Sequence, residues 1–289
     1  MIRYFILTLL SVTGFECLSQ INQQLVDDFA RNFSYQNKIH VDEVRNILDS
    51  AEYQQSIIDK MDRPAEDMEW HRYRKIFITE ERINAGVEFW DSNLAVINDV
   101  SQRYQVDPEI IVSIIGVESF FGTRKGTYKT LDALYTLAFG YPRRSKFFKA
   151  ELATFLLLAR KENLDVMSVK GSYAGAIGYV QFMPSSYEAY ARSYEPDGDR
   201  DLVNSAEDAL ASVANYFREH RWQMGKPVTQ LAILDTDARP LPSQSTKPKK
   251  TTNYYEGMGY KPSKPIDSNK LISLTAFSGY NQRSPTFSK

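Results

Sequence analysis

Apolar residues recur at the spacing of amphipathic helices over most of the chain up to residue 225. Two early helical runs cover residues 22–36 and 42–60, and Asp62-Arg63-Pro64 ends the second, because proline interrupts a helix. Two later runs predict stripes that face a core. These stripes consist of Ile83, Val87, Trp90, Leu94 and Ile97, and of Phe147, Phe148, Leu152, Phe155, Leu156 and Ala159.

Residues 107–122 are predicted to form a further helix, one that is buried on most of its surface. In Asp107-Pro108-Glu109, aspartate suits the N-cap, proline the first helical position, and glutamate the positive end of the helix dipole. Residues 110–117 are almost all apolar, and Gly122 is the expected C-cap.

The pattern changes after residue 170, where small residues accumulate up to Pro184. Ser185 with Glu188 predicts a capping box, and Ser205 with Asp208 predicts another helix start. Residues 239–265, rich in Pro, Lys, Ser and Thr, are expected to form a mobile loop or a weakly ordered subdomain. Residues 228–234 and 271–277 are predicted strands.

The first residues indicate export. Arg3 and the apolar run to Val12 resemble a signal peptide over residues 1–19, since the run is too short to span a bilayer. A buried N-terminal element is the alternative. Cys17 lies where a lipoprotein is acylated, although the preceding Phe15-Glu16 fits that signal poorly. Membrane attachment is expected only through a lipid on Cys17, and the net charge of −1 argues against nucleic acid as a partner.

Glu118 is the candidate catalytic residue. Its spacing from Ile111, Ile114 and Ile115 places the carboxylate on the same helix face as large aliphatic side chains. Burial and the negative end of the helix dipole both raise the pKa of such a carboxyl group, and a protonated acid is what a glycosidic oxygen needs as a general acid. The alternatives are an ion pair with Arg124 or a side chain that points outward.

A second carboxylate, which most glycosidases need, is missing near this helix. Asp132 begins an apolar stretch and is interpreted as a cap or an outward side chain. One acid suffices if the substrate assists. N-acetylmuramic acid can do so, because its acetamido group stabilises the anomeric centre and its C6 hydroxyl attacks intramolecularly.

Several ordered segments carry a family resemblance. Ile111-Val112-Ser113-Ile114-Ile115-Gly116-Val117-Glu118-Ser119-Phe120-Phe121-Gly122 resembles the catalytic segment of the membrane-bound lytic murein transglycosylase B family, glycoside hydrolase family 103. The other similar segments lie within residues 70–74, 86–90, 131–134, 139–144, 170–187 and 212–217. The resemblance covers about residues 25–225.

The resemblance implies a mainly α (α+β) fold with a lysozyme-like core. The expected parts are a helical domain (20–100), the catalytic core (101–225), a small β subdomain (226–270) and a C-terminal cleft segment (271–289). It implies cleavage of the MurNAc–GlcNAc β-1,4 bond of peptidoglycan with a 1,6-anhydromuramyl product, and Glu118 as the acid/base. The residues that match the family's substrate cleft are Tyr73, Ser172, Gln181, Phe182, Met183, Tyr216, Tyr280 and Asn281.

The family often carries an EF-hand-like calcium loop, here residues 193–208. The candidate ligands are Ser193, Glu195, Asp197, Asp199 and Asp208, with Gly198 at the sharp turn. Ser193 replaces a carboxylate and Pro196 stiffens the loop, so a solvated acidic turn is the alternative. No cofactor is required, and calcium would be structural.

The family also continues into an apolar terminal helix, whereas this chain stops at Lys289, so a reduced β subdomain is expected.

Two other functions stay open on the sequence. One is a hydrolytic muramidase of similar fold, in which water attacks in place of the C6 hydroxyl. The other is a catalytically reduced protein that binds peptidoglycan. Glycan strands of the periplasmic cell wall are the expected partner in every case, together with cell-wall synthesis proteins.

Overall fold

The structure, a computed structural model, describes residues 21–63, 70–196, 198–240, 247–276 and 285–288. Three groups of elements follow one another along the chain. The first comprises α1 (Gln23–Asn37), α2 (Val41–Asp49), α3 (Gln55–Asp62), α4 (Trp70–Phe77), α5 (Glu80–Ser92), α6 (Leu94–Tyr104) and α7 (Pro108–Ser119). The second comprises β1 (Tyr128–Lys129), α8 (Thr130–Gly140), η2 (Pro142–Arg144), α9 (Ser145–Lys161), β2 (Lys170–Gly171), α10 (Pro184–Tyr190) and α11 (Ala206–Glu219). The third comprises β3 (Thr229–Leu234), β4 (Lys250–Thr251), α12 (Thr252–Glu256), β5 (Tyr260–Pro262), β6 (Leu271–Ala276) and β7 (Pro285–Ser288).

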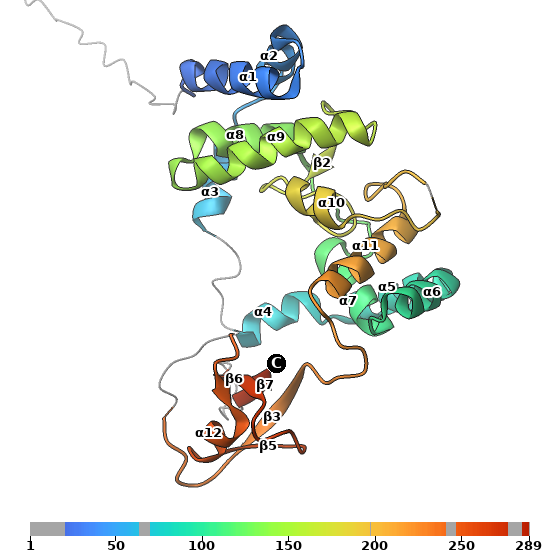
Figure 1. Ribbon diagram of the computed structural model, residues 1–289, viewed down its shortest axis with the longest axis vertical. Coiled ribbons are helices and arrows are strands. Elements are labelled where there is room, and N and C mark those ends of the chain that lie inside the picture. Colours follow the sequence, from blue (N-terminus) through green and yellow to red (C-terminus); the bar gives the residue numbers. More distant parts are fainter. Residues whose placement is uncertain (1–20, 64–69, 197, 241–246, 277–284, 289) are drawn as a thin grey trace, which may run out of the picture.

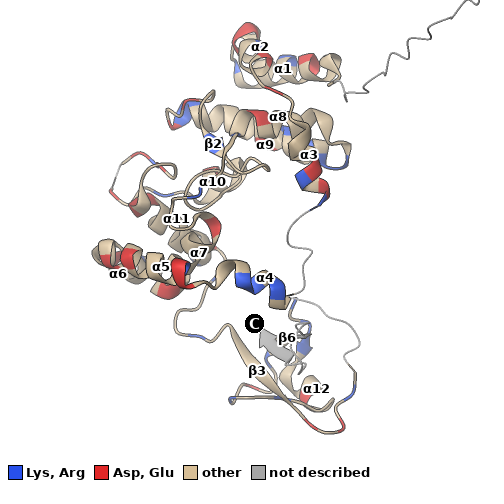
Figure 2. Cartoon of the chain, turned by 180° about the vertical axis from the view of Figure 1, so that it is seen from behind, with Lys and Arg blue, Asp and Glu red and all other residues tan. Residues whose placement is uncertain are grey.

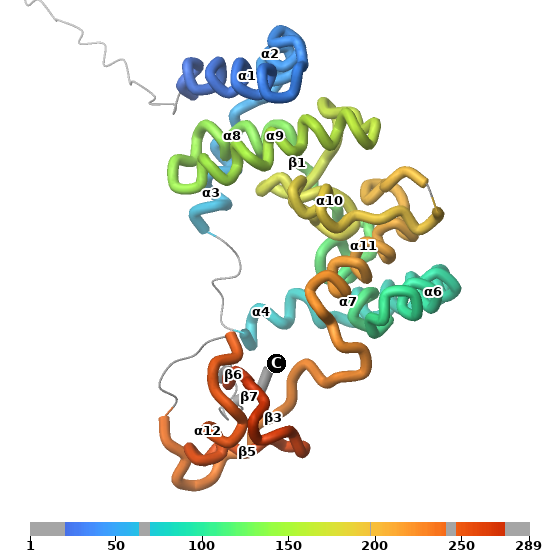
Figure 3. Tube along the Cα trace, in the orientation of Figure 1, coloured from blue at the N-terminus to red at the C-terminus, as the bar shows by residue number. Residues whose placement is uncertain are grey.

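The helices form successive layers along the long axis of the molecule (Figure 1). The pair α1 and α2 lies over α8 and α9, and α3 contacts α8 from the side (Figure 1). Further down, α11 contacts α10, which precedes it in the chain, and also α6 and α7, which are distant in sequence (Figure 3). One large cluster of buried apolar residues runs from α1 to α11 and holds these layers together.

The strands at the other end form an antiparallel sheet with the order β4-β6-β7-β3-β5. Its own small core consists of Ala232, Tyr260, Ile272 and Leu274. The helix α4, which carries Arg72, Arg74 and Lys75 but no acidic residue, lies between this sheet and the other helices (Figure 2). The predicted mainly helical chain with a small β part is confirmed. No helix among the described residues is long and apolar enough to cross a membrane.

Some predicted elements are wrong in detail. The run predicted over 42–60 is two helices, because the chain turns at residues 50–54 between α2 and α3. The stripe from Ile83 to Ile97 spans the break at Asn93. Ile97 is buried in the core and Trp90 packs against it, while Ile83, Val87 and Leu94 are exposed. In the segment predicted to be weakly ordered, the described residues 250–262 form β4, α12 and β5.

Of the two predicted helix caps at Ser185 and Ser205, one is confirmed and one is wrong. Ser205 caps α11 as expected, accepting a hydrogen bond from the Asp208 N–H at 3.1 Å. Ser185 does not cap α10, which begins one residue earlier at Pro184. Its hydroxyl instead donates to Oε1 of the buried Glu151 at 2.6 Å, while Glu188 pairs with Lys161 and Arg200. The predicted capping box is therefore wrong, because partners in other elements take both side chains.

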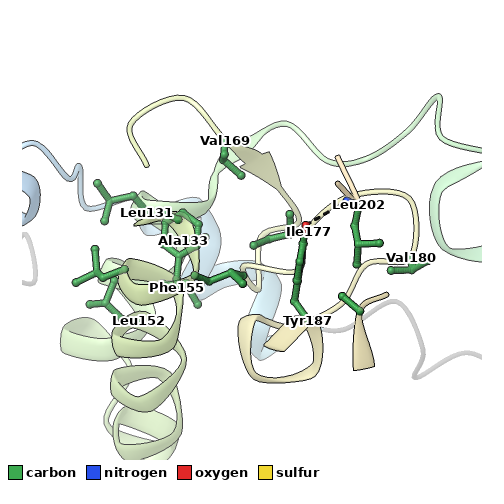
Figure 4. Packing of buried hydrophobic residues seen from close by; sticks show 14 of the residues in the cluster. Leu131, Ala133, Leu152, Phe155, Val169, Ile177, Val180, Tyr187 and Leu202 are labelled. Atoms are coloured by element: carbon green, nitrogen blue, oxygen red, sulfur yellow. Dashed lines mark hydrogen bonds between the residues drawn. The ribbon is translucent and has the colours of Figure 1, made fainter. Parts of the chain in front are cut away.

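Tyr187 lies at the centre of the packing around α10 (Figure 4). It is fully buried, and its ring packs in the same cluster as Phe155 and Ile177. Its hydroxyl accepts a hydrogen bond from the Leu202 N–H at 3.1 Å and donates to the Arg200 carbonyl oxygen. The phenol thus fixes the end of the loop after α10 to the core.

Replacing Tyr187 by phenylalanine leaves the Leu202 N–H and the Arg200 carbonyl without their partner. Since a buried polar group left unpaired costs about 1–3 kcal/mol, we expect Tyr187→Phe to lower the free energy of unfolding by about that amount. Urea denaturation followed by circular dichroism measures it. The matched control is Tyr35→Phe, because Tyr35 is 88% exposed. Equal stability of the two variants would contradict the assigned role.

Candidate functional site

Glu118 lies in the last turn of α7, as the sequence predicts. Ile111 and Ile115 on this helix are fully buried, whereas the Glu118 side chain opens into a cavity that solvent reaches. Asp107 does not cap the helix with its side chain. Its carboxylate accepts hydrogen bonds from Trp222 Nε1 at 2.7 Å and the Gly225 N–H at 2.9 Å, so the start of α7 is fixed to the segment after α11.

The helix ends at Ser119, not at Gly122, because three residues in succession adopt left-handed backbone. The φ angles of Phe120, Phe121 and Gly122 are 50°, 57° and 86°. This conformation costs non-glycine residues about 1–2 kcal/mol each. It directs the ring of Phe121 against Gly116 and Gly86, where a Cβ atom would come within 2.5 and 2.9 Å of that ring. The close packing offsets the backbone cost and fixes the turn that follows Glu118.

The cavity beside Glu118 has a volume of about 330 Å³ and is built from four segments. Helix α7 contributes Glu118, the loop before α10 contributes the middle of the lining, α10 contributes Ser186, and α11 closes the side. The other lining residues are Ile114, Val180, Gln181, Phe182, Met183, Ser186, Val213, Tyr216 and Phe217. The structure thus brings together five of the nine predicted catalytic and substrate-binding residues, namely Glu118, Gln181, Phe182, Met183 and Tyr216.

Gln181 is held in place by backbone groups. Its φ angle is 48°, and its Nε2 donates to the carbonyl oxygens of Gly178 at 2.8 Å and Lys125 at 3.1 Å. A Cβ atom on Gly178 would come within 2.0 Å of the Leu202 carbonyl oxygen, so this turn requires glycine. The side-chain oxygen of Gln181 keeps its acceptor capacity at the cavity wall.

Aromatic rings form the opposite wall. The rings of Phe182 and Tyr216 lie 5.8 Å apart, and Tyr190 packs edge-on against Tyr216 at 5.0 Å. His220 stacks on Tyr216 at 4.1 Å. Such surfaces suit the apolar faces of sugar rings. Tyr190 and His220, which the sequence did not single out, support Tyr216 without being among the described lining residues of the cavity. Helical spacing between residues 216 and 220 was the signal that could have identified His220.

Burial alone raises the pKa of the Glu118 carboxyl group. No hydrogen bond or ion pair joins Glu118 to another described residue. The expected alternative partner, Arg124, pairs with Glu81 at 3.1 Å and lies over the ring of Phe120. Glu118 is also the sole acidic group among the described residues that line the cavity.

Asp132, the acidic residue considered in the sequence as a second carboxylate, has a structural role. It is buried, and its carboxylate accepts hydrogen bonds from the Glu52 N–H at 3.0 Å and from Gln54 Nε2 at 3.1 Å. The prediction of an outward side chain is wrong, because α8 is buried along its length and the segment after α2 offers two donors.

Two other predicted cleft residues do not line this cavity. Ser172 has its hydroxyl engaged within its own loop, accepting from the N–H groups of Ala174 at 3.2 Å and Ala176 at 3.1 Å. Tyr73 lies on α4, with its ring between those of Trp70 and Phe77. Tyr280 and Asn281 fall outside the described residues.

The predicted calcium ligands that the structure describes do not gather into a metal site. No group of three or more Asp, Glu, His or Cys side chains is placed to hold a metal ion in the part of the chain that the structure describes, which leaves out Asp197. Asp208 is nearly buried, and its two carboxylate oxygens accept hydrogen bonds from the N–H groups of Tyr194 and Asp201, at 2.9 and 2.8 Å. Each carboxylate oxygen of Asp208 thus already accepts one hydrogen bond from the backbone.

Comparison with known proteins places this site in a family. The family model described as "Transglycosylase SLT domain" matches residues 22–287. The chain belongs to this family. It is 38% identical to membrane-bound lytic murein transglycosylase B of Escherichia coli (strain K12) over 262 residues, which make up 87% of this chain and 70% of that protein.

Solved structures agree with this assignment. Lytic transglycosylase SltB1 from Pseudomonas aeruginosa superposes with a TM-score of 0.86 at 36% identity, over 91% of this chain and 88% of that one. Lytic transglycosylase Slt35 from Escherichia coli, in complex with calcium, gives a TM-score of 0.84 at 37% identity, over 91% and 83%. The predicted family and the lysozyme-like fold are confirmed.

The raised pKa of Glu118 has a consequence for stability. Since the folded state binds this proton more tightly than the unfolded state, stability falls as the pH rises from the ordinary value of 4.5 through the raised pKa. We therefore expect Glu118→Gln to be more stable than the wild type at pH 7, and the gain to vanish below about pH 4. Thermal unfolding across this range measures the difference.

The matched control is Glu109→Gln, in the first turn of the same helix, where the dipole favours a carboxylate. It should bring no gain at pH 7. An unchanged or lower stability of Glu118→Gln at neutral pH would show that burial does not penalise this carboxylate.

Proposed function

We propose that this chain is a lytic transglycosylase that cleaves the β-1,4 bond between MurNAc and GlcNAc in peptidoglycan and leaves a 1,6-anhydromuramyl end. The family of the chain and its murein-cleaving relative in Escherichia coli support this class of enzyme. The observation that carries the mechanism is the position of Glu118, a partly desolvated carboxyl group without a charged partner, in a cavity that holds no second acid among its lining residues.

The first step uses Glu118 as a general acid. Its raised pKa favours the protonated form of the carboxyl group, and this proton passes to the glycosidic oxygen. The bond between this oxygen and C1 of MurNAc breaks, and GlcNAc leaves as an alcohol. The acetamido group of MurNAc stabilises the anomeric centre, so no second carboxylate is needed.

The second step uses the same residue as a base. The Glu118 carboxylate takes the proton of the MurNAc C6 hydroxyl group, and the C6 oxygen bonds to C1. Proximity within one sugar favours this attack over attack by water. The apolar residues beside Glu118, such as Ile114 and Val213, and the ring of Phe182 limit the water near C1. The residue regains its proton, and the reaction consumes no cofactor.

The aromatic wall and Gln181 are proposed to hold the glycan. Tyr216 and Phe182 offer faces for sugar rings, and the free amide oxygen of Gln181 can accept a hydrogen bond from a sugar hydroxyl or an acetamido N–H. Ser172 is proposed to shape the loop in front of the cavity. Tyr73 can reach only a more distant part of a strand, since it lies on α4.

The proposed place of action is the periplasm, on the glycan strands of the cell wall. The apolar run within residues 1–19 supports export, and the segment Phe15-Glu16 argues against lipidation of Cys17. Proteins of cell-wall synthesis stay predicted partners, and nucleic acid is not expected.

Digestion of purified sacculi tests the catalytic assignment. Glu118→Gln should reduce the release of soluble fragments by about 10²–10⁴-fold, because the amide cannot transfer a proton. Glu109→Gln, on the same helix but outside the cavity, should retain activity. Mass spectrometry of wild-type products should show ends lighter by one water molecule than hydrolytic ends. Hydrolytic masses would establish a muramidase, and full activity of Glu118→Gln would refute the role of this residue.

Calcium binding by residues 193–208 stays a prediction, and it would involve Glu195, Asp197 and Asp199 in place of Asp208. We expect Asp208→Asn to lower the free energy of unfolding by about 1–3 kcal/mol, because asparagine has one acceptor oxygen and leaves one of the two backbone N–H groups facing an amide donor. The loss should be equal in EDTA and in excess CaCl2, as measured by urea denaturation. Glu207→Gln is the neighbouring control. A loss seen only with calcium would make Asp208 a metal ligand after all.

A further inference from the structure

A second pocket, of about 360 Å³, lies where the segment after α11 meets the start of β6. Its cationic lining residues are Arg221, Lys226 and Lys270, and the imidazole ring of His220 lies beside them. No ion pair joins Arg221, Lys226 or Lys270 to another residue of the described part of the chain. Unpaired cations that converge on one pocket, in a chain whose net charge is −1, indicate a site for an anion.

The rest of the described lining is apolar apart from the amide side chain of Gln223. Trp222 forms part of the wall, and Val228 and Leu271 are 43% and 54% exposed. The acidic group that borders the pocket, Asp107, has both oxygens engaged by Trp222 Nε1 and the Gly225 N–H. Asp107 therefore fixes the shape of the pocket and does not neutralise the charges of Arg221, Lys226 and Lys270. A ligand with carboxylates and small aliphatic side chains matches this combination.

The basic pocket adjoins the Glu118 cavity. His220 lines the pocket, and Tyr216, one helical turn earlier, lines the cavity; their rings stack at 4.1 Å. Asp107, beside the pocket, and Glu118 stand at the two ends of α7, and eleven residues at 1.5 Å per residue separate them by about 16 Å. An extended peptide of five residues spans at most about 16–18 Å.

We propose that the basic pocket binds the free carboxylates of the peptide stem attached to the MurNAc residue in the Glu118 cavity. This inference rests on the proposed function and names a part of its substrate. The stem leaves the lactyl group of MurNAc, passes the stacked rings of Tyr216 and His220, and places its carboxylates near Arg221 and Lys226. Its alanine side chains contact Trp222 and Leu271.

The test compares two substrates: glycan strands that carry their peptides, and strands from which an amidase has removed them. The double variant Arg221→Gln/Lys226→Gln should lose about three- to tenfold in kcat/KM on peptide-bearing strands, the size expected of partly exposed charged contacts, and nothing on bare strands. The control Lys38→Gln/Lys146→Gln removes two exposed charges from α9 and from the end of α1, and it should behave like the wild type on both.

A second measurement needs no variant. Salt should slow the wild-type enzyme more on peptide-bearing strands than on bare ones, because screening weakens contacts between charges. Equal losses of the pocket variant on both substrates, or no loss on either, would overturn the proposal while cleavage by the wild type continues. Absence of cleavage by the wild type on both substrates would instead refute the proposed function itself.

Discussion

The site depends on how α7 ends. A buried helix that continued beyond Ser119 would carry Phe121 around the axis and away from Gly86 and Gly116. Three left-handed residues end it instead, and the ring of Phe121 fills the space that the two glycines leave. The last turn is thereby fixed with Glu118 facing the cavity, and the chain leaves toward Lys125, whose carbonyl oxygen holds Gln181. The turn that follows α7 therefore positions both Glu118 and the loop that carries Gln181.

The loop before α10 is the second half of this arrangement. Its conformation depends on hydrogen bonds that lie away from the cavity, such as those of the Ser172 hydroxyl with the N–H groups of Ala174 and Ala176. These contacts leave the cavity wall to Gln181, Phe182 and Met183, whose side chains contribute surface and acceptor groups. The parts of the loop that determine its shape and the parts that face the cavity are therefore different residues.

The sequence predicted the helical fold, the strands β3 and β6, and five residues of the cavity, because periodicity and a family motif are local signals. It failed where the partner of a side chain lies far along the chain. Ser185 suits a capping box, yet Glu151 takes its hydroxyl group, and Asp132 serves the segment at residues 52–54. The stripe through Ile83 and Val87 failed because the break at Asn93 redirects the helix. The grouping of Arg221, Lys226 and Lys270 arises only when β6 is placed beside the segment after α11.

The hydrogen bonds of Asp107 have a mechanical consequence. They tie the first residues of α7 to Trp222 and Gly225, which lead into the sheet, while the last turn of the same helix carries Glu118. A helix of twelve residues transmits displacement like a stiff rod. A displacement of the sheet would therefore be transmitted along α7 to Glu118. The segment that carries Arg221 and Lys226 would move together with Glu118.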